Sequence, residues 1–194
     1  MKIWLASQSP RRRELLTQIG VDYELLLPDD RDAAEALEAV RANEPPDRYV
    51  VRVALAKLEL AERTRHAREL PMWPILCADT TVAIGSRVLG KPADADEARA
   101  MLASLSGRTH RVLSAVAVQR GGRIRHRIQV SRVTMKRLRE HEIDAYVASG
   151  ESFDKAGGYG IQGRAARFIR RIEGSHSGIM GLPLYETAQL LGGP

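Results

Sequence analysis

Residues 2–20 read KIWLASQSPRRRELLTQIG, and this stretch sets the beginning of the fold. KIWLAS is apolar and then small, which predicts a short buried strand, and SPRRRELLTQIG predicts a helix that Gly20 ends. Ser9 is a candidate N-cap, and Pro10 takes the first helical position, where its missing N–H is not needed. The chain therefore begins with a strand that leads directly into a helix.

Strands and helices intermix along the rest of the chain. Strands are predicted at 21–28, at 74–90 as a strand followed by a hairpin, at 109–138 as a pair joined at Gly121-Gly122, and at 167–174. Helices are predicted at 48–70, 94–107, 141–150 and 182–191, and residues 29–47 are predicted to be a mobile segment with a partial helix. Hairpins among helices indicate a mixed α/β sheet rather than an all-parallel one.

Length and composition narrow the class of protein. The chain has 194 residues, of which 44% are hydrophobic and 28% charged, as in an ordinary globular protein. Cys77 is the only cysteine, which excludes an intramolecular disulfide. No apolar run approaches the roughly 20 residues of a membrane-spanning helix, and MKIWLASQSPRRR has too short an apolar run for a signal peptide. We therefore expect a soluble cytoplasmic protein without a membrane partner.

The charge balance is basic, at +6. Such an excess attracts nucleotides or nucleic acid. Aromatic residues, which would stack on bases, make up only 5% of the chain and the charges are dispersed, so stable nucleic-acid binding is not expected. Of the 30 basic residues five are lysine and the other 25 arginine. Where arginine is the usual cation, a lysine in a loop indicates a need for a compact ammonium group.

Ser7–Arg13 (SQSPRRR) is the first candidate site. A helix N-terminus presents free N–H groups and a partial positive charge, so it suits an anion. Three arginines in the first turn oppose that dipole unless an anion lies there, although exposed arginines tolerate a penalty of only about 0.3–1 kcal/mol. The arrangement favours a phosphate-type ligand over a merely exposed turn.

Asp79 interrupts an apolar strand within ADTT (78–81). Such a carboxylate is unfavourable unless it is paired, bound to a metal or placed at the open end of the strand. It can take a proton from an attacking water or hold Mg²⁺ on phosphate oxygens. An aspartate that caps the following hairpin would leave the same sequence pattern, so the residues alone favour neither interpretation.

Two loops place a lysine beside glycine: Gly90-Lys91-Pro92 and DKAGGYGIQG (154–163). Glycine lets a backbone approach a ligand closely, and Gln162 offers a donor and an acceptor to the edge of a nucleobase. Neither loop matches the dinucleotide or P-loop pattern, and each taken alone is more simply a structural turn. A zinc site is not expected, because the histidines are scattered and His141-Glu142 lacks a second histidine.

Together these stretches suggest a nucleotide phosphate site assembled from several loops. Over nearly its whole length the chain resembles the Maf family of nucleoside triphosphate pyrophosphatases. The matching stretches are LASQSPRRRELL (5–16), VRVALAKL (51–58), CADTTV (77–82), GKP (90–92), MLASLSGRTHRVLSAVAV (101–118), GESFDKAGGYGIQG (150–163) and GLPLYET (181–187). The resemblance implies a single domain over residues 1–194, with an elongated mixed sheet flanked by helices and two lobes around a central cleft, similar to inosine triphosphate pyrophosphatases.

The resemblance also implies an activity: hydrolysis of a nucleoside triphosphate between the α and β phosphates with a divalent metal, Mg²⁺ or Mn²⁺. By position, Asp79 is the expected proton acceptor, and Arg11, Thr80 and Gln162 set substrate preference. Phosphate and metal contacts are expected from the residues Ser9, Arg12, Lys57, Lys91 and Lys155, with Lys57 and Lys91 counted as catalytic. The form DKAGGYGIQG resembles the branch that prefers dTTP and UTP.

Three positions depart from the family pattern. The family usually has an acidic pair after the second strand, but here that segment is longer. Asp32 and Glu35 therefore compete for this role, and no metal ligand is assigned. Ser114 stands where threonine is usual, and His176 stands where tyrosine is usual, at the expected rim of the cleft. Alternatives remain open: a pyrophosphatase for 7-methyl-GTP or noncanonical purines, or a non-catalytic nucleotide- or nucleic-acid-binding regulator of septum formation. A homodimer is compatible with the sequence.

Overall fold

A computed structural model describes residues 1–192, apart from the side chain of Arg31. The strands are β1 (Lys2–Leu5), β2 (Asp22–Leu25), β3 (Ile75–Ile84), β4 (Arg87–Leu89), β5 (Thr109–Arg120), β6 (Arg123–Met135) and β7 (Ile169–Glu173). The helices are α1 (Pro10–Gln18), α2 (Arg31–Ala36), α3 (Pro46–Ala67), α4 (Ala95–Leu105), α5 (Glu140–Ala148), α6 (His176–Met180) and α7 (Leu184–Leu191), with short 3₁₀ turns η1 (Ala156–Gly158) and η2 (Arg164–Phe168).

Within residues 1–192 the strands form one seven-stranded sheet in the order β2-β1-β3-β5-β6-β7, with β4 paired to β3. Strands β2, β1 and β3 run parallel, whereas β3, β5, β6 and β7 are antiparallel neighbours. The predicted mixed α/β sheet is therefore confirmed, including the turn at Gly121-Gly122 that joins β5 to β6.

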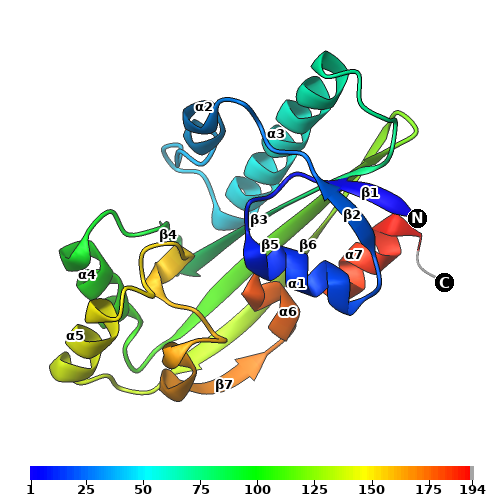
Figure 1. The fold of residues 1–194 in the computed structure, drawn as a ribbon. Helices are drawn as coiled ribbons and strands as arrows, with labels where there is room; N and C mark the ends of the chain where they lie inside the picture. Colours follow the sequence, from blue (N-terminus) through cyan, green and yellow to red (C-terminus); the bar gives the residue numbers. More distant parts are fainter. Residues whose placement is uncertain (193–194) are drawn as a thin grey trace.

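Helices cover both faces of the sheet (Figure 1). Helix α3 packs on one face of β3 and β5, where Val50, Val53 and Leu58 are fully buried, as their spacing predicts. Helices α1 and α7 pack on the opposite face. Because side chains alternate along a strand, Cys77 contacts the α3 layer while Ala78 contacts the α1 layer. The same alternation sends Asp79 and Thr80 to different faces.

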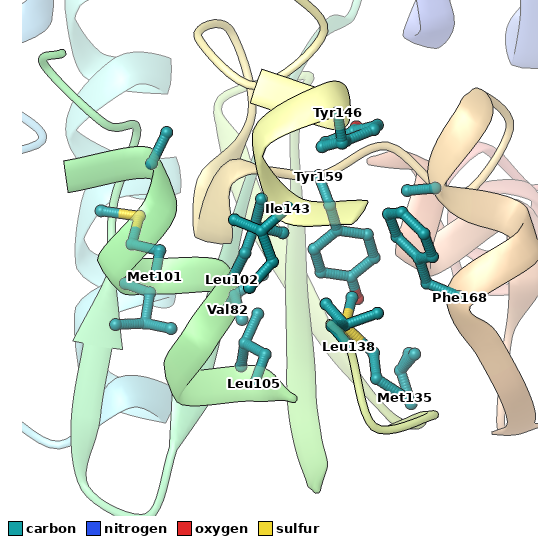
Figure 2. Packing of buried hydrophobic residues seen from close by; sticks show 14 of the residues in the cluster. Val82, Met101, Leu102, Leu105, Met135, Leu138, Ile143, Tyr146, Tyr159 and Phe168 are labelled. Carbon is teal, nitrogen blue, oxygen red and sulfur yellow. The ribbon is translucent and has the colours of Figure 1, made fainter. Parts of the chain in front are cut away.

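The far part of the sheet is covered by α4, α5 and η2 (Figures 1 and 2). Leu102 and Leu105 of α4 are fully buried there, and Tyr146 meets Phe168 edge to face at 5.7 Å between ring centroids. Figure 2 shows Tyr159, from the glycine-rich loop, inside this cluster. The middle of that loop is thus anchored in the hydrophobic core.

Most predicted elements are present, with two differences. Residues 29–47 contain the predicted partial helix, α2, but helix α6 was not predicted, because five residues are too few to show a helical period. Ser9 lies at the N-cap position of α1, with Pro10 following as expected, yet its side chain makes no capping hydrogen bond. Its N–H instead donates to Ser7 Oγ at 3.2 Å.

None of the helices described within residues 1–192 combines the length and apolar character needed to cross a membrane. Cys77 is fully buried, and burial raises the pKa of its thiol to about 12, so it is the inert core thiol that its apolar surroundings predict.

His110 of β5 is only 2% exposed. We therefore expect the free energy of unfolding to depend on pH. The Nε2 of His110 lies 2.6 Å from the Tyr159 hydroxyl, its Nδ1 has no partner in the described part of the chain, and burial lowers its pKa to about 4. Since an unfolded histidine has a pKa near 6.5, acidification protonates the unfolded chain first. Stability is therefore retained above about pH 6.5, and a fall to pH 4.5 is expected to remove about 2–3 kcal/mol.

Urea unfolding at pH 7.5 and pH 4.5 checks this expectation. The His110→Gln variant should lose less stability on acidification than the native protein, whereas a matched change at the exposed His126, His126→Gln, should leave the pH dependence as it is. An equal pH dependence in the native protein and His110→Gln would contradict the assignment.

Candidate active site

A cavity of about 540 Å³ lies where the loop between β1 and α1, the middle of β3, helix α3 and the glycine-rich loop meet. All nine residues that the sequence predicts to be catalytic or substrate-binding line it: Ser9, Arg11, Arg12, Lys57, Asp79, Thr80, Lys91, Lys155 and Gln162. Segments more than 150 residues apart in sequence thus converge on one cavity. The structure brings the nine together, and their individual roles stay predictions.

The start of α1 faces this cavity. The Arg12 Nε donates to the carbonyl of Gly181 at 2.8 Å, and its Nη1 donates to Ser7 Oγ at 3.2 Å. Within residues 1–192 Arg12 forms no ion pair, and burial holds the pKa of its guanidinium below the ordinary value. A half-buried cation without a carboxylate partner, beside the free N–H groups of a helix start, forms a site for an anion.

Asp79 belongs to a small charged cluster on the α3 face of β3. Lys57 Nζ donates to Asp79 Oδ1 at 2.7 Å and to Glu38 Oε1 at 2.6 Å. Lys91 Nζ donates to the other Glu38 oxygen at 3.1 Å. The side chain of Asp79 is 8% exposed, so the carboxylate is paired, as its place in an apolar strand requires.

The cluster stabilises the charged forms of Lys57 and Glu38. Burial alone would lower the pKa of Lys57, but the charges of Asp79 and Glu38 outweigh it and raise that pKa above its ordinary value. Burial opposes ionisation of Glu38 too, yet the nearby ammonium groups of Lys57 and Lys91 bring the Glu38 pKa below its usual range. Glu38 thus remains ionised beside the lysine that it shares with Asp79.

The glycine-rich loop forms the facing wall. Gly157 has φ +71°, and a Cβ there would lie 2.9 Å from Val82 of β3, so only glycine fits this close approach. Its N–H donates to the carbonyl of Gly90 at 2.9 Å. This loop is therefore held directly against β3 and the loop that carries Lys91.

Asp154 joins the glycine-rich loop to the start of α1. It accepts from Arg11 Nη1 at 3.1 Å and contacts Lys155 Nζ, which also donates to the carbonyl of Glu151 at 2.8 Å. Gln162 is exposed at the cavity and free to present its amide. The pair of Arg11 and Asp154 bridges two walls of the cavity.

Glu38 is not among the acids expected from the sequence, Asp32 and Glu35. Of the two expected candidates, Glu35 lines the cavity, whereas Asp32 is exposed in the first turn of α2 and does not. The acid that contacts both lysines is Glu38, just after α2 ends. It follows Glu35 by three residues but lies in the turn beyond α2, so no helical period in the sequence indicates it. His176 is exposed at the start of α6 and does not line the cavity.

The acids of the cavity fit a magnesium-type ion. Within the described residues no three His, Cys, Asp or Glu side chains converge as a metal-binding group. Mg²⁺, however, is commonly bound by one or two carboxylates, with waters and substrate phosphates completing its shell. Glu38 and Asp79 are two such carboxylates, and both line the cavity beside Arg12.

A family model described as Maf-like protein matches residues 2–193. The chain belongs to the Maf family. A relative from Cupriavidus metallidurans, 62% identical over 97% of this chain and 94% of its own length, is named dTTP/UTP pyrophosphatase. A relative from Ralstonia nicotianae, 58% identical over 97% of this chain and 92% of its own length, carries the same name.

This Maf protein is also similar, more distantly, to a solved structure. The crystal structure of a nucleoside-triphosphatase, or dITP/XTP pyrophosphatase, from Mycobacterium abscessus aligns with a TM-score of 0.42 and 16% identity over 71% of this chain and 76% of that chain.

Proposed function

We propose that this Maf protein hydrolyses dTTP and UTP to the nucleoside monophosphate and pyrophosphate. The observation that carries the proposal is one cavity that holds both Arg12 and Asp79. Arg12 is a half-buried cation that pairs with no acid in the described chain, and the carboxylate of Asp79 is bound by Lys57. An anion site beside a proton acceptor is what hydrolysis of a phosphoanhydride requires. The choice of dTTP and UTP as substrates follows the names of its close relatives.

The triphosphate is held by positive groups on three walls. Arg11 and Arg12 come from α1, Lys91 from the loop after β4 and Lys155 from the glycine-rich loop. Negative charge accumulates on the pyrophosphate as it leaves, and preorganised cations stabilise that charge. Ser9, whose hydroxyl makes no capping bond, is free to contact a phosphate oxygen.

Asp79 takes the proton from the attacking water. The water oxygen forms the new bond to the α phosphorus, the bond from that phosphorus to the bridging oxygen breaks, and pyrophosphate leaves with the electron pair. The contact with Lys57 fixes the Asp79 carboxylate in one orientation and keeps it paired before substrate arrives. Glu38 fixes Lys57 from its other side.

Glu38 and Asp79 would hold the divalent cation, Mg²⁺ or Mn²⁺, together with phosphate oxygens of the substrate. When bound, such an ion neutralises phosphate charge and lowers the pKa of a bound water. The fit rests on the number and type of carboxylates in the cavity.

Incubation of the purified protein with a panel of triphosphates and Mg²⁺ or Mn²⁺, followed by separation of the products, tests the proposal. Turnover of dTTP and UTP to monophosphate and pyrophosphate is expected. Nucleoside diphosphate plus phosphate would place the cut at a different bond. Preferred turnover of 7-methyl-GTP or purine triphosphates, or triphosphates bound but left intact, would overturn the proposed specificity or the proposed reaction.

A further inference from the structure

The turn that carries Glu38 is tied to helix α3 through three consecutive backbone carbonyls. Arg52 Nη1 donates to the carbonyl of Leu37 at 3.1 Å, and its Nη2 donates to that of Ala39 at 2.9 Å. The Tyr49 hydroxyl donates to the carbonyl of Glu38 itself at 2.8 Å. Carbonyls at the end of a helix lack partners within that helix, so two side chains of α3 satisfy groups that would otherwise need water.

The backbone N–H groups of this turn form local hydrogen bonds. Those of Glu38 and Ala39 donate to the carbonyls of Glu35 and Ala36, three positions earlier, at 2.9 and 3.2 Å. Bonds between such close neighbours shape a turn but do not fix its position relative to the sheet. The position of the Glu38 backbone beside the cavity therefore depends on side chains that reach it from other elements.

Arg52 is itself fixed in orientation. Its Nε and Nη2 donate to the two carboxylate oxygens of Glu44 at 2.6 and 2.8 Å, and its Cζ lies 5.4 Å from the centre of the Tyr49 ring. The side chains of Arg52 and Glu44 are 20% and 10% exposed. A bidentate pair holds the plane of the guanidinium, and this planar group can reach two carbonyls and a carboxylate at once.

Helix α3 thus contacts Glu38 at both its backbone and its carboxylate. Tyr49 holds the backbone, Arg52 holds the residues on either side, and Lys57 donates to the carboxylate at 2.6 Å. With 3.6 residues per turn, positions 49, 52 and 57 lie on one side of the helix. A carboxylate on a fixed backbone loses less conformational freedom when it binds a ligand, so its binding is stronger.

We propose that Tyr49 and Arg52 are positioning residues for divalent-metal binding: they fix the backbone about Glu38 and so preorganise its carboxylate for the cation. This inference rests on the proposed function, in which Glu38 would hold Mg²⁺ or Mn²⁺, and deepens it. The Tyr49 hydroxyl and the Arg52 guanidinium are engaged by carbonyls, so both residues act through Glu38. Loss of the outer partners of a metal ligand commonly costs about 10–100-fold in metal affinity.

Two conservative variants, Tyr49→Phe and Arg52→Lys, test the inference. Phenylalanine removes a single hydroxyl, and lysine keeps a positive charge for Glu44 but cannot span two carbonyls as well. The probe is Mn²⁺ with the α,β-imido analogue of UTP, which cannot be hydrolysed at the bond between the α and β phosphates. Electron paramagnetic resonance of free Mn²⁺ should show binding weakened about tenfold in each variant. Excess Mn²⁺ should restore kcat for UTP.

The controls separate metal positioning from a general structural role. Arg48→Lys, the same exchange at an exposed position of α3, should bind Mn²⁺ as the native protein does. In EDTA the analogue should bind the native protein, Tyr49→Phe and Arg52→Lys equally, because the proposed phosphate ligands Arg11 and Arg12 lie on α1. An equal loss of analogue affinity with and without Mn²⁺ would overturn the metal-positioning role.

A double-mutant cycle shows whether Tyr49 acts through Glu38. Glu38→Gln should weaken Mn²⁺ binding, and addition of Tyr49→Phe to that variant should cause no further loss. A further loss would mean that Tyr49 acts elsewhere, and native Mn²⁺ affinity in both Tyr49→Phe and Arg52→Lys would overturn the inference outright. Native Mn²⁺ affinity in Glu38→Gln would remove Glu38 as a ligand, and the inference with it.

The failure of the proposed function would look different. Absence of monophosphate and pyrophosphate after incubation of the native protein with UTP and dTTP would mean that the proposed reaction is wrong. The Mn²⁺ affinities are measured with an uncut analogue, so they would still decide the role of Tyr49 and Arg52.

Discussion

Asparagine in place of Asp79 is expected to lower kcat for dTTP and UTP by about 10³-fold, within the range that a positioned general base contributes. The amide is close in size to the carboxylate and can still accept a hydrogen bond from Lys57, which the native residue receives at 2.7 Å. It cannot accept a proton from the attacking water at neutral pH. The substrate should therefore still bind while the chemical step slows.

Single-turnover measurement of pyrophosphate release, together with a binding titration of UTP, separates these effects. A thermal unfolding scan shows whether the variant is folded. Asp22→Asn, at an exposed aspartate on β2, is the matched control and should retain the native rate. Near-native turnover in a folded Asp79→Asn protein would remove Asp79 as the proton acceptor.

The second large effect is expected from Lys57→Met. Methionine fills similar space but leaves Glu38 and Asp79 facing each other without the shared ammonium, which lies 2.6 and 2.7 Å from their oxygens. Removal of one partner from such a buried pair costs about 3 kcal/mol of stability. Loss of the cation that orients Asp79 should lower kcat by about 10²-fold.

The stability defect of Lys57→Met should depend on pH in a definite direction. Lys57 holds the pKa of Glu38 below its usual range in the folded protein, so its removal raises that pKa. Protonation of Glu38 at lower pH then relieves the repulsion in the variant. Urea unfolding should show the gap to the native protein narrow from pH 7.5 to pH 5. Arg63→Met, an exposed cation change on the same helix, is the control, and an equal gap at both pH values would contradict the model of the cluster.

The fold was predictable where local signals agree with the tertiary structure. The helix after Pro10, the long helix carrying Lys57 and the strand pair about Gly121 each combine a hydrophobic period with clear start or stop residues. Helix α6 was missed because its five residues end at Gly181 before a period can be seen. Its position depends on tertiary bonds, such as that from Ser114 to Gly178.

The residues of the candidate site could be predicted from the sequence more completely than the contacts between them. Lysines 57, 91 and 155 were distinctive among many arginines, and each lines the cavity. The choice of Glu38 could not be made from the sequence, because it depends on how the segment after α2 returns toward α3. There the Glu38 carboxylate accepts hydrogen bonds from the ammonium groups of Lys57 and Lys91, which lie 19 and 53 positions away along the chain.

The close approach of Gly157 to Val82 bears on how new substrate preferences arise in such a protein. The approach to Val82 and the hydrogen bond from Gly157 to Gly90 hold the first half of the glycine-rich loop against β3. Gln162 lies in a later, exposed part of the same loop. We propose that Gln162 meets the base, so that its replacement changes nucleotide choice and leaves Asp79 undisturbed. On this proposal, single exchanges at Gln162 change nucleotide choice during evolution, whereas a change at Gly157 displaces the loop from β3 and disturbs recognition and hydrolysis together.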